Sequence, residues 1–244
     1  MNYIRENLSV VHERIKVACL KAGRNPQEVS LLLATKTVSS ENIKIALQSG
    51  ETLIGENKVQ ELKEKYNALK DTPHQAHFIG HLQTNKIKDV LKYADCIQSV
   101  DRTELVEKLD ARLQREGRKA DIMIQVNSSF EESKFGIAPQ EAVSFAKIVS
   151  QYDTLQVKGL MTIGLFSAEQ EQVRKCFQLL KRLQQQIIGL NLPHFELNHL
   201  SMGMSHDLET AIEEGATMVR VGTAIFGSRI YPDSYYWNEQ ATNK

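Results

Sequence analysis

The sequence is poor in cysteine. Its three cysteines, Cys19, Cys96 and Cys176, lie far apart and form no Cys-x-x-Cys pair. This usage argues against a disulfide framework and against a zinc site, and it is typical of reduced, intracellular proteins. We therefore expect a cytoplasmic protein without a bound metal.

An excess of charge of one sign and long apolar runs are also missing. The 244 residues carry 30 Lys+Arg and 30 Asp+Glu, so the formal net charge is zero and attracts neither nucleic acid nor an acidic membrane. No apolar run reaches the ~20 residues of a membrane-spanning helix. The amphipathic stretch 1–21 does not resemble a signal peptide. We therefore predict no nucleic-acid partner and no membrane partner.

No linker rich in glycine, serine or proline divides the chain. Hydrophobic residues make up 41% and charged residues 25%, which is ordinary for a globular protein. We therefore expect one domain over residues 1–230. A polar tail over 231–244, with tyrosine and tryptophan but no periodicity, would follow it.

Short apolar runs rich in β-branched residues alternate with stretches of helical periodicity, which is the pattern of a parallel βα sheet. Eight runs follow the opening amphipathic helix: 29–35, 52–55, 76–80, 96–100, 122–126, 157–162, 195–200 and 218–221. The clearest helices between them are 40–48, 58–68, 103–115, 139–150, 169–188 and 205–213. This count and length predict an α/β fold, a single (β/α)₈ barrel with an extra N-terminal helix. An open doubly wound sheet is the alternative, but its Gly-x-Gly-x-x-Gly turn is missing after the first run.

In such a barrel the functional face is built from the carboxyl ends of the strands. The polar residues at these positions are Lys36, Glu56, Asn57, His81, Gln83, Ser99, Asn127, Thr162, Ser201 and Arg220. This set lacks the clustered ligands of a metal site and the carboxylate pair of a glycosidase.

Two segments have the composition of phosphate-binding loops. Leu200–Ser205 offers hydroxyls and backbone N–H groups ahead of a helix, and Gly222 with Thr223 follows the eighth strand. Phosphate sites after strands seven and eight recur in this fold. The alternative is that Gly203 and Gly222 only permit tight turns, but their occurrence on adjacent strands favours phosphate.

Lys36, at the end of an apolar strand, could act on such a ligand in two ways. It could pair with the anion as an ammonium, or attack a carbonyl as a free amine if its pKa falls from about 10.4. A phosphorylated aldehyde held as an imine uses both the lysine and the phosphate loops, and pyridoxal 5′-phosphate (PLP) is the common molecule of this kind. A lysine that simply reaches into water is the alternative.

Arg220 would suit the pyridine nitrogen of that cofactor. An arginine donates a hydrogen bond there without giving up its proton, which leaves the ring a weak electron sink. The alternative is a structural ion pair with Glu196 or Glu56.

Five ordered motifs resemble those of the pyridoxal phosphate homeostasis protein family, called YggS in bacteria and PROSC in animals. They are Leu33–Lys36, Ile54–Glu61, His77–Lys86, Leu200–Ser205 and Arg220–Gly227. The resemblance covers about residues 5–230 and implies a barrel similar to the N-terminal domain of alanine racemase. It implies PLP bound as an aldimine on Lys36. It further implies that the residues holding the rest of the cofactor are Ser201, Gly222 and Thr223 at the phosphate, Arg220 at the pyridine nitrogen, and Asn57 in the pocket wall.

The resemblance implies a PLP carrier in vitamin B6 homeostasis, with PLP-dependent apo-enzymes as transient recipients. The alternative is a racemase, which needs an acid–base group on each face of the substrate α-carbon. Lys36 could serve one face, but the chain ends just beyond the barrel, so we expect no second domain like that of alanine racemase. A phosphate-binding isomerase without a cofactor is a third interpretation. We predict a monomeric carrier that is not an enzyme.

Overall fold

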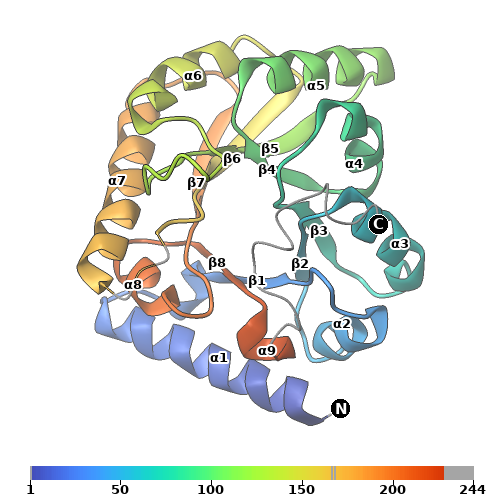
Figure 1. Ribbon diagram of the computed structural model, residues 1–244, viewed down its shortest axis with the longest axis vertical. Helices are drawn as coiled ribbons and strands as arrows, with labels where there is room; N and C mark the ends of the chain where they lie inside the picture. The colour runs from blue at the N-terminus through green and yellow to red at the C-terminus, as the bar shows by residue number, and fades with distance from the viewer. Residues whose placement is uncertain (1, 166, 168, 228–244) are drawn as a thin grey trace.

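The chain folds around a closed barrel of parallel strands (Figure 1). A computed structural model describes residues 2–165, 167 and 169–227, and the predicted tail over 231–244 lies outside these residues. Each strand pairs with the next along the chain, and β8 pairs with β1 to close the ring. Helices surround the ring on the outside (Figure 1). The predicted (β/α)₈ barrel with an extra N-terminal helix is confirmed.

All eight predicted strands are present, with ends that differ from the prediction by at most two residues. Their bounds are β1 (Ser30–Ala34), β2 (Leu53–Glu56), β3 (Gln75–Phe78), β4 (Cys96–Val100), β5 (Ala120–Gln125), β6 (Leu155–Met161), β7 (Phe195–Ser201) and β8 (Met218–Val221). Both faces of such a sheet are covered, so the strands read as apolar runs instead of alternating patterns.

The helices follow the predicted order. They are α1 (Asn2–Lys21), α2 (Ser40–Leu47), α3 (Val59–Leu69), α4 (Ile87–Tyr93), α5 (Thr103–Glu116), α6 (Ala142–Val149), α7 (Gln170–Ile188), α8 (Leu208–Glu213) and α9 (Thr223–Phe226). The predicted start at residue 205 is wrong, because the backbone N–H of Met204 donates to the Asp207 carboxylate and keeps this stretch a loop. The helix predicted from Pro139 opens with a 3₁₀ turn. The single turn α9 is too short to show periodicity.

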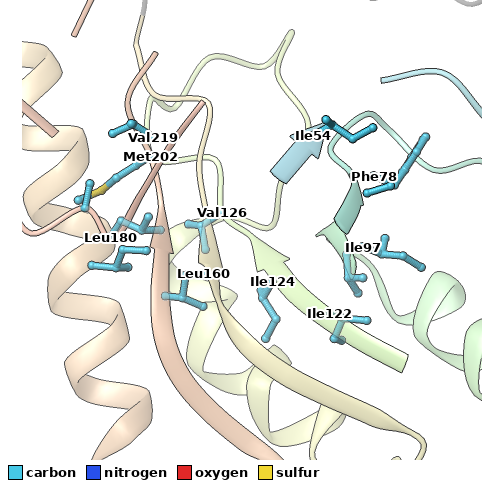
Figure 2. Packing of buried hydrophobic residues seen from close by; sticks show 14 of the residues in the cluster. Ile54, Phe78, Ile97, Ile122, Ile124, Val126, Leu160, Leu180, Met202 and Val219 are labelled. Carbon is cyan, nitrogen blue, oxygen red and sulfur yellow. The ribbon is translucent and has the colours of Figure 1, made fainter. Parts of the chain in front are cut away.

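Neighbouring residues of β1, β2, β4, β5, β6 and β8 belong to two separate apolar cores. Leu31 and Leu33 of β1 pack in the large core between the barrel and the helices, while Leu32 belongs to a smaller cluster inside the ring. Figure 2 shows part of the large core, where Ile122 and Ile124 of β5 lie near side chains of the neighbouring strands. The inner cluster consists of Leu32, Leu53, Ile79, Cys96, Met123, Met161 and Met218. The ring is therefore a packed core and not a pore.

The N-terminal helix α1 crosses the outside of the barrel beside α8 and α9 (Figure 1). Its apolar face, with Ile4, Leu8, Val11 and Ile15, is buried against the large core. Among the described helices, none is both long enough and apolar enough to traverse a bilayer.

Candidate functional site

Two buried cations stand at the carboxyl ends of neighbouring strands. Lys36 follows β1 and is 7% exposed, and Arg220 in β8 is 6% exposed. The register between the strands sets Leu32 opposite Arg220 and Leu33 opposite Val221. The segments that follow β1 and β8 therefore leave the barrel side by side. The interpretation of Lys36 as a solvated surface lysine is wrong, since this side chain is buried.

Arg220 is held by one oxygen acceptor at the end of β7 and another in the residue that follows β6. Its Nη1 donates to Ser201 Oγ at 2.9 Å, and its Nη2 donates to the backbone oxygen of Thr162 at 2.7 Å. Burial lowers the pKa of Arg220 to about 10, and the nearby Asp207 carboxylate opposes that shift. The guanidinium therefore remains protonated at neutral pH.

Glu196 and Glu56, the two acidic partners suggested for Arg220, form ion pairs with other residues. Glu196 pairs with Lys158 at 2.9 Å, and Glu56 pairs with Lys65 at 2.7 Å. The contacts of Arg220 are instead with neutral oxygen acceptors, which leaves the positive charge of the guanidinium at the barrel mouth.

A hydrogen-bonded chain runs from Arg220 into the barrel. Ser201 Oγ, which accepts from Arg220, donates to Gln98 Oε1 at 2.6 Å. The Gln98 amide nitrogen then lies 2.7 Å from His77 Nδ1 and 3.2 Å from Met218 Sδ. Because arginine can only donate, the chain assigns Nδ1 of His77 as an acceptor and leaves this histidine neutral. Burial, with a smaller contribution from His199, lowers the pKa of His77 to about 4.

The burial of His77 makes its contribution to stability depend on pH. The folded pKa of about 4 is below the ordinary 6.5, so the contribution is full above pH 6.5 and is lost as the pH falls towards 4. We expect the free energy of unfolding of the wild type relative to His77→Asn to fall by about 3 kcal/mol over that range. Urea titrations at several pH values measure it. Parallel pH profiles for the two proteins would show that His77 is not held neutral.

The loop after β7 and the turn after β8 meet in a cluster of hydroxyls. Thr223 Oγ1 and Ser205 Oγ lie 3.1 Å apart, and the backbone N–H of Ala224 points to the same serine oxygen at 3.4 Å. Gly203 has φ +91° and lies against Ala211, so a side chain there would be strained and would overlap its neighbour. The loop backbone accordingly requires glycine, and the tight-turn interpretation of Gly203 is compatible with a phosphate cradle.

Helix α1 contacts the loop after β7 and helix α9 from outside. Arg14 pairs with Glu209 through two nitrogens, at 2.6 and 2.9 Å, and donates to the backbone oxygen of Ser205 at 2.9 Å. Asn7 donates to the backbone oxygen of Ile225 in α9 at 2.9 Å. The extra N-terminal helix thus connects the predicted phosphate loop after β7 with α9, which begins at Thr223.

The structure separates Ser201, which ends β7, from Ser205 in the loop that follows. Ser201, predicted to hold phosphate, is fully buried with its hydroxyl on Arg220 and Gln98, whereas Ser205 contacts Thr223. The sequence predicted no separate role for Ser205, although this residue lies inside the Leu200–Ser205 motif. Asn57 is buried after β2, and its backbone oxygen packs so closely on Gly80 that a side chain could not fit there.

A buried ionic network lies behind Lys36. Lys65 of α3 donates to Glu56 Oε1 at 2.7 Å, to Glu61 Oε2 at 2.9 Å and to the backbone oxygen of Thr35 at 2.8 Å. Burial raises the pKa of Glu56 to about 7 against the opposing effect of Lys65. The sequence did contain a signal for this buried network: Lys65 falls on the apolar face of α3, in line with Leu62 and Leu69. The equivalent signal for Gln98 was a polar residue within an apolar strand.

Another part of the same rim, in the segments after β3 and β5, carries an aromatic stack. His81 lies over Phe135 with ring centroids 3.8 Å apart and an interplanar angle of 16°. Phe135 belongs to the loop after β5, where the Asn127 side chain donates to the backbone oxygens of Glu131 and Lys134. His81 was predicted to lie at the rim, without a role. The contacts of Asn127 hold its own loop, so its role is structural. In the part of the chain that the structure describes, no group of three His, Cys, Asp or Glu could hold a metal.

Comparison with known proteins identifies the family to which this chain belongs. The family model for the N-terminal domain of alanine racemase matches residues 5–230. A pyridoxal phosphate homeostasis protein of Aquifex aeolicus (strain VF5) is 42% identical over 229 residues, which are 93% of this chain and 98% of the relative. The chain belongs to the pyridoxal phosphate homeostasis protein family. The resemblance found in the five motifs is thereby confirmed.

Solved structures agree with this membership of the pyridoxal phosphate homeostasis protein family. The crystal structure of an unknown protein from Bifidobacterium adolescentis has a TM-score of 0.88 and 37% identity, and the match covers 92% of this chain and 95% of that one. PipY of Synechococcus elongatus PCC7942, solved with PLP bound, has a TM-score of 0.74 and 33% identity, and the match covers 89% and 100% of the two chains.

Proposed function

We propose that this protein binds PLP, holds it as a reversible Schiff base on Lys36 and serves vitamin B6 homeostasis without catalysing an amino-acid reaction. The observation that carries the proposal is the buried pair Lys36 and Arg220 beside the hydroxyl cluster of Ser205 and Thr223. The PLP-bound structure of the relative PipY supports it, and so do the names of the curated relatives, which describe homeostasis and no enzyme.

The residues at this rim fit the chemical features of the cofactor. A phosphate requires hydrogen-bond donors, which the hydroxyls of Ser205 and Thr223 offer. The pyridine nitrogen requires a donor at the barrel mouth, and only two of the five N–H groups of Arg220 take part in the bonds to Ser201 and Thr162.

Lys36 supplies the amine. Its condensation with the aldehyde forms one carbon–nitrogen double bond and releases one water, so added water can reverse it. Arg220 stays protonated and donates to the ring nitrogen without protonating it. When bound, PLP is an electron sink, and this neutral nitrogen weakens the sink. An arrangement that grips the cofactor but activates it weakly favours storage and transfer over amino-acid chemistry.

The proposal predicts a coloured protein that does not racemise amino acids. Cofactor-free protein mixed with PLP should turn yellow and keep the label after borohydride reduction. Incubation with single L-amino acids in deuterated water should exchange the α-proton no faster than free PLP does, as measured by NMR. Exchange at enzyme-like rates would favour the racemase alternative, and a colourless protein indifferent to borohydride would favour an isomerase without a cofactor.

A further inference from the structure

The residue that follows Lys36 has an unusual backbone. Thr37 has φ +63°, a left-handed conformation that a β-branched residue rarely adopts. Its side chain is exposed, so packing of that side chain does not explain the conformation. Strained backbone of this kind persists where surrounding interactions hold it, and it is concentrated at functional sites.

Two hydrogen bonds hold this backbone. The N–H of Val38 donates to the backbone oxygen of Thr35 at 2.9 Å and closes a turn over Lys36 and Thr37, and a second bond comes from α3. Glu61 Oε2 accepts the backbone N–H of Thr37 at 2.7 Å and also accepts from Lys65 at 2.9 Å. The strained peptide is therefore bonded to a carboxylate whose own position is fixed by a buried ammonium group. Such charge-assisted bonds are shorter and stronger than neutral ones.

The residue before Lys36 is held by the same network. Thr35 Oγ1 donates to Glu56 Oε1 at 2.5 Å, and the backbone oxygen of Thr35 accepts from Lys65 at 2.8 Å. Lys65 thus uses its three donors on both flanks of Lys36, directly at Thr35 and through Glu61 at Thr37. Lys36 is the single residue between two backbone positions that α3 and β2 fix in place.

We propose that Glu61 is a positioning residue, which keeps Thr37 left-handed and so directs the Lys36 amine towards the cofactor aldehyde. This inference rests on the proposed attachment of PLP to Lys36. Without the carboxylate, the N–H of Thr37 loses its acceptor, and of the two bonds the turn bond from Val38 to Thr35 remains, so the backbone samples the extended region more often. The amine then spends less time in the attacking geometry, so the Schiff base forms more slowly.

The test compares Glu61→Ala with Glu64→Ala, a change on the exposed face of the same helix where Glu64 contacts Gln60. In cofactor-free protein, Glu61→Ala should raise amide hydrogen exchange at Thr37 by about tenfold, because a hydrogen bond to a charged group is lost. It should slow the growth of PLP absorbance by a similar factor. Glu64→Ala should change neither quantity.

A second substitution separates positioning from general damage. Glycine adopts positive φ without steric strain, so Thr37→Gly added to Glu61→Ala should recover a large part of the lost rate. Wild-type exchange and wild-type rate in Glu61→Ala would overturn the proposal. A slowed rate that the glycine does not recover, with a lowered melting temperature, would also overturn it by assigning Glu61 a purely structural role. A wild type that takes up no PLP contradicts the proposed function instead, and the exchange comparison alone then decides whether Glu61 holds Thr37.

Discussion

Replacing Lys36 with alanine is expected to abolish the covalent adduct with PLP completely. The amine is the group that condenses with the aldehyde, and it is buried after β1 beside the proposed phosphate cradle. The predicted phosphate contacts of Thr223 and Ser201 do not depend on this amine, so weak non-covalent binding should remain. Absorbance titration, followed by borohydride reduction and dialysis, measures both quantities.

The matched control is Lys58→Ala. Lys58 is half-buried at the start of α3 on the same rim, next to Asn57. This variant should keep the full adduct. That result would show that removing a lysine elsewhere on the rim does not abolish the adduct. An undiminished adduct in Lys36→Ala would show that another lysine carries the imine.

Replacing Lys65 with alanine is expected to destabilise the fold by about 3–5 kcal/mol, because it leaves a buried carboxylate without its cation. Glu56 is fully buried, and its Oε2 has no hydrogen-bond partner among the described residues, so Lys65 and Thr35 provide its bonds through Oε1. Urea denaturation at pH 8 measures the effect. The exposed change Lys63→Ala on the same helix should stay within about 0.5 kcal/mol of the wild type.

The pH dependence of this loss has a definite sign. Glu56 already has a pKa near 7 in the wild type, raised by burial and held down in part by Lys65. Without Lys65 the pKa rises further, so the folded variant binds a proton that the unfolded chain releases at a lower pH. Its stability should therefore fall as the pH rises, and the loss at pH 5.5 should be smaller than at pH 8. Adding Glu56→Gln should recover part of the loss at pH 8. An equal loss at both pH values would contradict the network.

Much of the fold could be predicted from periodicity because strand and helix patterns are local. The run 96–100 was predicted with the bounds that β4 has. Local patterns fail where a side chain competes with the helix, as Asp207 does by accepting from Met204. They also fail for elements of a single turn such as α9.

The site could be predicted in part because strand ends converge in a barrel, which brings Lys36, Arg220 and Thr223 to one face. The hydrogen-bonded chain through Gln98 and His77 could not be predicted, because it depends on which polar side chains share the inside of the ring. The hydrogen bond from Thr37 to Glu61 depends on a backbone dihedral angle and on a side chain from another element. Neither feature has a spacing along the sequence that reveals it.

The most direct test of the account is peptide mapping after the PLP-treated protein has been reduced with borohydride. Reduction converts the reversible imine into a stable secondary amine and marks the lysine that carried it. The account predicts a single major labelled peptide, modified at Lys36, and loss of this label in the presence of excess inorganic phosphate. A label on a different lysine, or one spread evenly over surface lysines, would contradict it.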